Sequence, residues 1–146
     1  MNRYKLFTAA CVFFLSGWLL SSCKVEEIAP LAEMPKNLSG SWKIIKATRN
    51  GTDVTNVFDF TQFRIKFDST GNYTMENKLP FIVNANGKYA LDDPQYPFKL
   101  TFTPEGGTTV ATPFNYPTVA GVRQLSLTFS PGCELNAYIY TLTKEQ

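Results

Sequence analysis

Hydrophobic and polar residues alternate along most of the chain from residue 38 onward. The alternation is clearest at Phe63, Ile65 and Phe67, each of which is followed by a charged residue. A period of two is typical of a strand that buries one face and exposes the other. The same pattern predicts strands near residues 40–48, 62–68, 72–76, 81–83, 87–91, 98–103, 108–112 and 124–143, the last with a break.

Local breaks in the alternation indicate where the strands bend or turn. The hydrophobic phase changes between Ile44 and Ile45, which predicts a bulge or a sharp bend. Turn-forming residues that end in glycine occupy residues 68–71 and 84–87, and we expect a hairpin at each of them. Helical spacing does not extend over ten residues after the leader, although residues 53–60 have room for one helical turn.

These elements predict an all-β fold. Strands that are joined by short hairpins, with no helix to cover a sheet, must close into a barrel or pack as two layers. We predict an antiparallel meander of about eight strands that closes into a barrel, because closure removes exposed strand edges. A two-layer β-sandwich is the alternative.

The first 22 residues have the parts of an export signal. Arg3 and Lys5 precede an apolar run over residues 6–20, and small residues lead to Cys23. As a helix this run would reach about 22 Å, less than a bilayer core of about 30 Å, which disfavours an uncleaved membrane span. The Leu-Ser-Ser-Cys sequence favours lipoprotein processing over a plain secretory cut before Lys24. We therefore expect Cys23 to begin the mature chain and to carry a lipid anchor.

The chain after the signal divides into a short tether and one domain. Residues 23–37 contain glutamates and prolines without a clear period, a composition typical of a flexible tether. We assign residues 1–22 to the signal peptide, 23–37 to the lipidated cysteine and its tether, and 38–146 to the β-domain.

Composition narrows the chemistry that the domain can perform. Removal of the leader takes away two of the 14 basic residues and leaves 12 basic against 12 acidic side chains. The mature chain therefore has no excess of positive charge that would attract nucleic acid. Histidine is absent, which excludes Ser/His/Asp and Cys/His mechanisms and removes the commonest zinc ligand. Asp92 and Asp93 precede a proline and indicate a turn rather than an acid–base pair. We expect no catalytic residue, no metal site and no cofactor.

One cysteine remains in the domain itself. Cys11 leaves with the leader and Cys23 carries the lipid, so Cys133 has no partner for an internal disulfide. Without a histidine beside it to lower its pKa, we interpret Cys133 as a small, partly buried residue rather than a reactive thiol.

Several short segments carry a resemblance to a known family. They are LSGSWKI (38–44), NGTDVT (50–55), FDSTGNY (67–73), GKY (87–89) and LDDPQYPF (91–98). With them the chain resembles the lipocalin-like domains of Bacteroidetes lipoproteins, within a branch that has no established activity. The resemblance runs over residues 38–103. It implies a calycin-type antiparallel barrel and carries no catalytic residues. We expect the chain to be an outer-membrane lipoprotein, and which side of the membrane the domain faces stays open. Unlike true lipocalins, the chain has no C-terminal helix pattern and no disulfide.

Aromatic residues provide two sets of candidate site residues. One set is expected to point into the barrel, where it either lines an apolar pocket or packs the interior solid. Its members are Trp42, Phe63, Phe67, Tyr73, Tyr89, Phe98, Phe102 and Phe129. The other set stands between prolines in two loops and is a candidate rim for contacts with a sugar or a protein. Its members are Tyr96, Phe114 and Tyr116.

The sequence therefore predicts a non-enzymatic lipoprotein of the cell envelope. Its expected role is binding or accessory, towards a small apolar or glycan-derived ligand or a protein partner. The alternative is a structural subunit or spacer with a fully packed barrel and no ligand. A cavity above roughly 300 Å³ behind the aromatic residues would favour a small ligand. A filled barrel with a contiguous apolar surface patch would favour a protein partner.

Overall fold

The structure, a computed structural model, describes residues 32–133 and 135–145. These residues belong to a compact unit that begins at Ala32. The strands are β1 (Gly40–Arg49), β2 (Thr52–Asp53), β3 (Arg64–Phe67), β4 (Asn72–Glu76), β5 (Gly87–Leu91), β6 (Lys99–Pro104), β7 (Val110–Pro113), β8 (Thr118–Val119), β9 (Val122–Phe129) and β10 (Tyr138–Lys144). The described part contains no helix, and hence none that is long and apolar enough to cross a membrane. The prediction of an all-β fold is confirmed.

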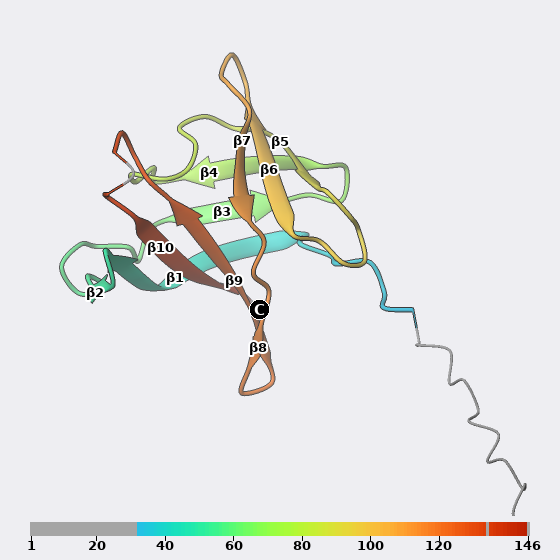
Figure 1. Cartoon of the computed structure of the whole chain (residues 1–146), viewed down its shortest axis with the longest axis horizontal. Helices are drawn as coiled ribbons and strands as arrows, with labels where there is room; N and C mark the ends of the chain where they lie inside the picture. The colour runs from blue at the N-terminus through green and yellow to red at the C-terminus, as the bar shows by residue number, and fades with distance from the viewer. Residues whose placement is uncertain (1–31, 134, 146) are drawn as a thin grey trace, which may run out of the picture. The chain divides into compact units, whose positions relative to one another are not determined.

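The strands form one antiparallel meander that curls into a half-barrel (Figure 1). Their order is β7-β6-β5-β4-β3-β1-β10-β9-β8, and β2 pairs with β1 beside this path. The first and last long strands pair with each other, so the meander closes where the two ends of the chain meet. It stays open between β7 and β9. Pro113 and Pro117 lack the N–H donors that a ladder needs there, and Pro131 follows the end of β9.

The bulge predicted in the first long strand is confirmed. β1 pairs with β10 in register from Trp42 to Ile44, and the register then shifts before Lys46. Ile45 is left without a partner in this ladder and is exposed. Because a bulge bends its strand, β1 can pair with β3 through its first residues and with β2 through its last two.

The hairpin predicted at residues 68–71 is confirmed between β3 and β4. The Asp68 carboxylate accepts the backbone N–H groups of Thr70 and Asn72, each at 2.8 Å. Hydrogen bonds from Asn72, and then from Thr70, lower the pKa of Asp68 to about 2. Gly71 has a φ of 87°, which glycine adopts without strain. The carboxylate and the glycine together fix this turn.

The strand predicted over residues 81–83 is wrong. Residues 77–86 form a loop between β4 and β5, so the hairpin expected at residues 84–87 is also wrong. Phe81 and Val83 are both buried, as the alternation requires. The stretch follows Pro80, which has no N–H to donate to a ladder. Residues 54–57 form a turn in which the Val57 N–H donates to Val54 O at 3.0 Å, and no helix follows.

The hydrophobic core lies on the inner face of the half-barrel. Trp42 is fully buried, and its indole N–H donates to Leu38 O at 2.8 Å. The core residues are Leu38, Trp42, Ile44, Ala47, Val54, Phe60, Phe63, Ile65, Phe67, Tyr73, Met75, Phe81, Val83, Leu100, Phe102, Leu125, Leu127, Phe129, Tyr140 and Leu142. This core draws on nearly every long strand and on two loops. The segment 54–63 contributes three of its side chains, and the segment 77–86 contributes two.

Candidate functional site

Aromatic side chains fill the inside of the half-barrel. Phe81, from the loop between β4 and β5, lies among them. Its ring centroid is 5.2 Å from that of Phe63, 5.8 Å from that of Phe129 and 6.1 Å from that of Tyr140. These spacings are those of packed aromatic pairs. The loop therefore occupies the space that a central ligand would need.

Two buried tyrosine hydroxyls hold this loop in place. Tyr140 donates to Pro80 O at 2.9 Å, and Tyr73 donates to Ala85 O at 2.8 Å. Burial raises the pKa of both phenols to about 12, with smaller contributions from Tyr138 at Tyr140 and from Glu105 at Tyr73. The hydroxyls consequently stay protonated, and keep donating, at any physiological pH.

The two free edges of the sheet meet along a seam between β7 and β9. Just past the end of β7, Asn115 forms an isolated bridge with Ser126 and accepts its N–H at 2.9 Å. Further along the seam, Thr112 is only 2% exposed. Its hydroxyl donates to Thr128 O at 2.8 Å and accepts the Thr128 N–H at 3.2 Å. One side chain thus takes the place of the ladder at this point of the seam.

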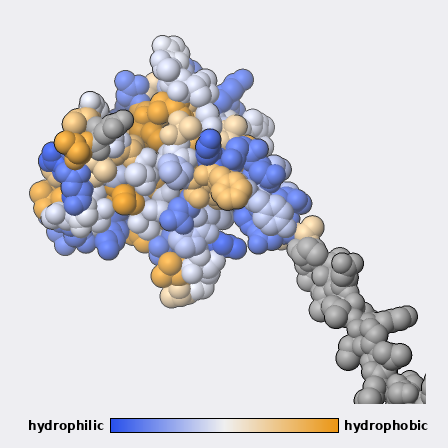
Figure 2. Space-filling view, in the orientation of Figure 1, coloured by the Kyte–Doolittle hydropathy of each residue, from blue (hydrophilic) through white to orange (hydrophobic). Residues whose placement is uncertain are grey.

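A groove with both polar and apolar surface opens where the seam widens beyond Thr112. One hollow of about 150 Å³ lies between β7 and the end of β9, and another of about 340 Å³ lies between β7 and the loop 77–86. The two hollows share Phe81, Ile82 and Val110, and we call them together the seam groove. Its other lining residues are Val83, Asn84, Pro104, Gly107, Thr108, Ala111, Thr128, Phe129, Ser130 and Pro131. Hydrophobic surface is visible beside β7 at this place (Figure 2).

The edge of β7 turns backbone groups towards the seam. On its other side, the Phe114 N–H donates to Phe98 O at 2.8 Å, in continuation of the ladder between β6 and β7. Hydrogen-bonded pairs alternate along an antiparallel ladder. Thr112 and Val110 therefore direct their backbone groups to β6, whereas Ala111 directs its N–H and C=O into the seam. The groove thus combines the apolar side chains of Phe81, Ile82 and Val110 with polar surface and a strand edge.

A third hollow, of about 370 Å³, lies where β4 and β5 separate. The ladder between these strands has two residue pairs, and the Met75 N–H of β4 donates instead to the Asn86 side chain at 2.9 Å. Most of its lining residues are polar, but the surface that they turn towards the hollow is mainly apolar. The lining residues are Asn72, Tyr73, Thr74, Asn86, Gly87, Lys88, Thr103, Pro104 and Glu105. Tyr73, the aromatic residue in this lining, is buried, so the hollow offers no open ring on which a sugar could stack.

Most of the aromatic residues predicted to point inward do lie in the core. Trp42, Phe63, Phe67, Tyr73, Phe102 and Phe129 are buried, and Tyr89 packs against them. Phe129 also borders the seam groove. The prediction is wrong for Phe98, which is 77% exposed. Its N–H donates to the Asp92 carboxylate at 2.9 Å in the bend before β6, so Phe98 stands outside the alternating part of the strand.

The three residues predicted at a rim lie apart from the seam groove. The rings of Phe114 and Tyr116 are 5.4 Å apart, and Tyr116 lies 6.0 Å from Trp42, so both pack against the core. Tyr96 is exposed, and its hydroxyl accepts the Glu33 N–H at 3.3 Å. Tyr96 and Tyr116 therefore serve the contact with the N-terminal segment rather than a common binding rim.

Apart from Phe129, the residues that shape the seam groove were not among the sequence candidates. Phe81 and its neighbours looked like an ordinary strand, and Pro80 was the one available signal that ladder pairing ends there. Val110, Ala111 and Thr112 alternate like any strand residues, so nothing in the sequence distinguishes the edge that they form.

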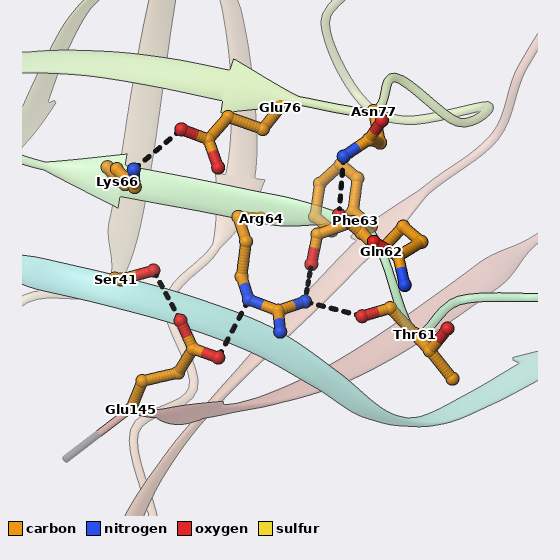
Figure 3. A network of polar contacts seen from close by, with 9 residues as sticks. All are labelled: Ser41, Thr61, Gln62, Phe63, Arg64, Lys66, Glu76, Asn77 and Glu145. Atoms are coloured by element: carbon orange, nitrogen blue, oxygen red, sulfur yellow. Dashed lines mark hydrogen bonds and ion pairs between the residues drawn. The ribbon is translucent and has the colours of Figure 1, made fainter.

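A network of charged residues lies on the outer face of β1, β3 and β4 (Figure 3). The Arg64 guanidinium is 2.7 Å from the Glu145 carboxylate, which also accepts the Ser41 hydroxyl at 2.8 Å. The Ser41 hydrogen bond, followed by the charge of Arg64, lowers the pKa of Glu145. Lys66 and Glu76 form a second pair at 2.6 Å across β3 and β4. These pairs tie neighbouring strands together.

The other candidates for chemistry occupy loops. The Asp92 carboxylate accepts the N–H groups of Lys99 and Phe98, and these hydrogen bonds lower its pKa. The chain bends over residues 92–96, in agreement with the predicted turn. Cys133, expected to be partly buried, is exposed because it lies in the loop between β9 and β10. Within residues 32–133 and 135–145, no three His, Cys, Asp or Glu side chains are grouped as metal ligands. Cys23 lies outside the described residues.

Comparison with known proteins identifies one family. Residues 21–143 match the family described as "Domain of unknown function (DUF5004)". No curated protein and no solved structure matches the chain significantly. Because this description assigns no activity, the role of the seam groove is inferred from its geometry.

Proposed function

The chain belongs to the DUF5004 family, and we propose that it is a lipid-anchored, non-catalytic binding domain of the cell envelope. In this proposal the lipid on Cys23 holds a lipocalin-like half-barrel at the outer membrane. The domain binds an extended, apolar segment of a partner protein at the seam groove. No nucleic acid and no cofactor takes part.

The seam groove carries this proposal. The aromatic packing around Phe81 leaves the middle of the half-barrel filled, which speaks against a ligand inside it. Apolar side chains and a free strand edge instead meet beside Val110 and Ala111, within a groove that also has polar surface. An extended peptide can add to such an edge through main-chain hydrogen bonds, while its side chains enter the groove.

Site-specific cross-linking in intact cells tests this binding mode. Replacing Val110 with the photoreactive residue benzoylphenylalanine is expected to give a cross-linked adduct with a protein. Val57 is the matched control, because it is an exposed valine in the turn after β2. The same replacement there is expected to give no adduct.

Adding Ala111→Pro to the Val110 probe tests the role of the strand edge. Proline removes the N–H that faces the seam, and a net hydrogen bond is worth about 0.5–1.5 kcal/mol, so the adduct is expected to fall several-fold. Equal adducts at positions 110 and 57, or an adduct that is insensitive to Ala111→Pro, would contradict strand addition. No adduct at either position would favour the second candidate function, a spacer, which the filled interior supports.

The lipid anchor is tested by fractionation of cells that express the full chain. Cys23→Ser is expected to move the protein from the membrane fraction to the soluble fraction, because a serine hydroxyl cannot replace the thiol that is alkylated. Cys133→Ser is the matched control and is expected to stay with the membrane. If Cys23→Ser also stayed there, the hydrophobic leader would be the anchor and the lipoprotein proposal would be wrong.

A further inference from the structure

The N-terminal segment 33–37 lies against the domain at a defined place, although it falls within the predicted tether. The Lys36 N–H donates to Pro94 O at 2.7 Å. The Tyr116 hydroxyl donates to Asn37 O at 3.3 Å, in addition to the contact between Glu33 and Tyr96. These hydrogen bonds hold the N-terminal segment at one end of the half-barrel, and the chain runs from this end towards Cys23.

The distance from that end to the anchor is limited by the length of the chain. Cys23 precedes Glu33 by ten residues, and a chain of this length spans at most about 35 Å when fully extended. A lipid on Cys23 therefore keeps this end of the domain close to the membrane surface.

Large hydrophobic side chains are exposed at the same end. Phe98 is 77% exposed and Met34 is 83% exposed. The protruding hairpin of β8 and β9 adds exposed Val119 and Val122, and hydrophobic surface at its tip is visible in Figure 2. In a water-soluble domain such side chains would more favourably be buried.

Contacts through Tyr116 show that these side chains belong to one end of the structure. The Arg123 guanidinium donates to Tyr116 O at 3.1 Å and lies 5.3 Å from its ring, which joins the hairpin to the N-terminal segment. Phe114, whose ring packs on Tyr116, donates its N–H to Phe98 O. Tyr116 is thus linked to Phe98, to the hairpin of β8 and β9 and to the N-terminal segment, which all lie at one end of the structure.

The acidic residues nearby are engaged within their own loop. The Asp93 carboxylate accepts the N–H groups of Gln95 and Tyr96, each at 2.7 Å. The Glu33 carboxylate pairs with Lys36. Neutralised or hydrogen-bonded carboxylates reduce the repulsion that lipid phosphates would otherwise exert on this end.

We propose that this end of the domain, which we call the anchor face, rests on the lipid surface. Phe98, Met34 and the tip of the hairpin of β8 and β9 then lie among the headgroups and the first carbons of the acyl chains. Apolar and amphipathic side chains favour this position, and contacts of this kind add a second membrane signal to a covalent lipid. The proposal rests on the lipid anchor proposed above.

This orientation has a consequence for the seam groove. β9 begins with Val122 at the anchor face and ends with Phe129 at the groove. Eight residues of strand span about 23 Å. A domain that rests on the anchor face therefore holds the seam groove away from the membrane, where it is open to a partner protein.

Fluorescence quenching by brominated lipids tests the anchor face. The mature protein, lipidated in cells and beginning at Cys23, is reconstituted into phosphatidylethanolamine vesicles with bromine on the acyl chains. The emission of the Phe98→Trp variant is expected to shift to shorter wavelength and to lose intensity. The matched control is Leu135→Trp, which is 84% exposed in the loop that follows β9, and its emission is expected to stay unchanged. Buried Trp42 provides a constant background in both variants.

The outcomes separate the two proposals. If the protein floats with the vesicles but the Phe98→Trp variant is not quenched, the anchor face is wrong and the lipid anchor stands. If both variants are quenched equally, the domain has no preferred face and the proposal is also wrong. If the protein does not float, the lipid anchor fails and the anchor face fails with it. A concentration-dependent dimer that Phe98→Ser breaks, without quenching, would assign this end to a second copy and overturn the proposal.

Discussion

Trp42→Ala is expected to lower the free energy of unfolding by about 3–5 kcal/mol. The Trp42 side chain is fully buried and lies 6.0 Å from the Tyr116 ring. Its removal leaves a cavity and also leaves Leu38 O without the indole N–H that it accepts at 2.8 Å. A small domain has a total free energy of unfolding of only about 5–15 kcal/mol. The variant is therefore expected to unfold at a markedly lower urea concentration than the unchanged protein.

Equilibrium urea denaturation of residues 24–146, followed by far-ultraviolet circular dichroism, measures this loss. Trp42→Phe separates the two contributions, because it keeps a ring and loses the N–H. Its cost is expected to be about 1–3 kcal/mol, the penalty of an unpaired buried acceptor. Phe58→Ala is the control, because Phe58 is exposed and surface changes usually stay within about 0.5 kcal/mol. A Trp42→Ala cost no larger than that of Phe58→Ala would contradict the position of Trp42 in the core.

The sequence predicted the strands because burial on one face imposes a period of two. The pattern located β3, β4 and the bulge at Ile45, and the composition of residues 68–71 located the first hairpin. In each of these cases the determinant is local, since a turn or a bulge is specified by a few adjacent residues. The alternation was equally informative about the core, which contains most of the aromatic residues assigned to it.

The features that local patterns missed depend on contacts between distant segments. Phe81 alternates with its neighbours as a strand residue would, but its loop is held by Tyr140, 59 residues further along the chain. Phe98 has the parity of an inward residue, yet the Asp92 carboxylate holds its backbone in a bend. A period of two reports which side chains are buried, and it does not report which backbone groups find a partner.

The seam groove is the clearest case of this limit. Whether β7 completes a ladder with β9 depends on both strands at once, and the Thr112 hydroxyl takes up the Thr128 backbone groups that such a ladder would have used. The seam opens beside Val110 because a side chain has replaced the ladder hydrogen bonds at Thr112, and because prolines end β7 and follow β9. No single segment of the sequence carries this information.

Gly87→Ala is expected to cost about 3 kcal/mol or more, at or above the upper end of the usual range for overpacking. Gly87 is the first residue of β5, where it pairs with Tyr73 on one side and Pro104 on the other. A Cβ atom there would lie 2.1 Å from Thr103 O and 2.7 Å from Pro104 Cα. Both atoms belong to the backbone of β6, so no side-chain rotation can relieve the overlap. The strands must separate instead.

Gly71→Ala is the matched control for this change, measured by the same urea denaturation. Its backbone has a φ of 87°, but its Cβ would meet Tyr89 O at 3.5 Å, which is an ordinary contact. Its expected cost is therefore the left-handed strain alone, about 1–2 kcal/mol. The overlap lies between β5 and β6, so it is expected to separate these strands at the Gly87 end of their ladder and to disturb the two residue pairs that join β5 to β4. A larger cost for Gly71→Ala than for Gly87→Ala would show that β5 and β6 lie further apart than in this structure.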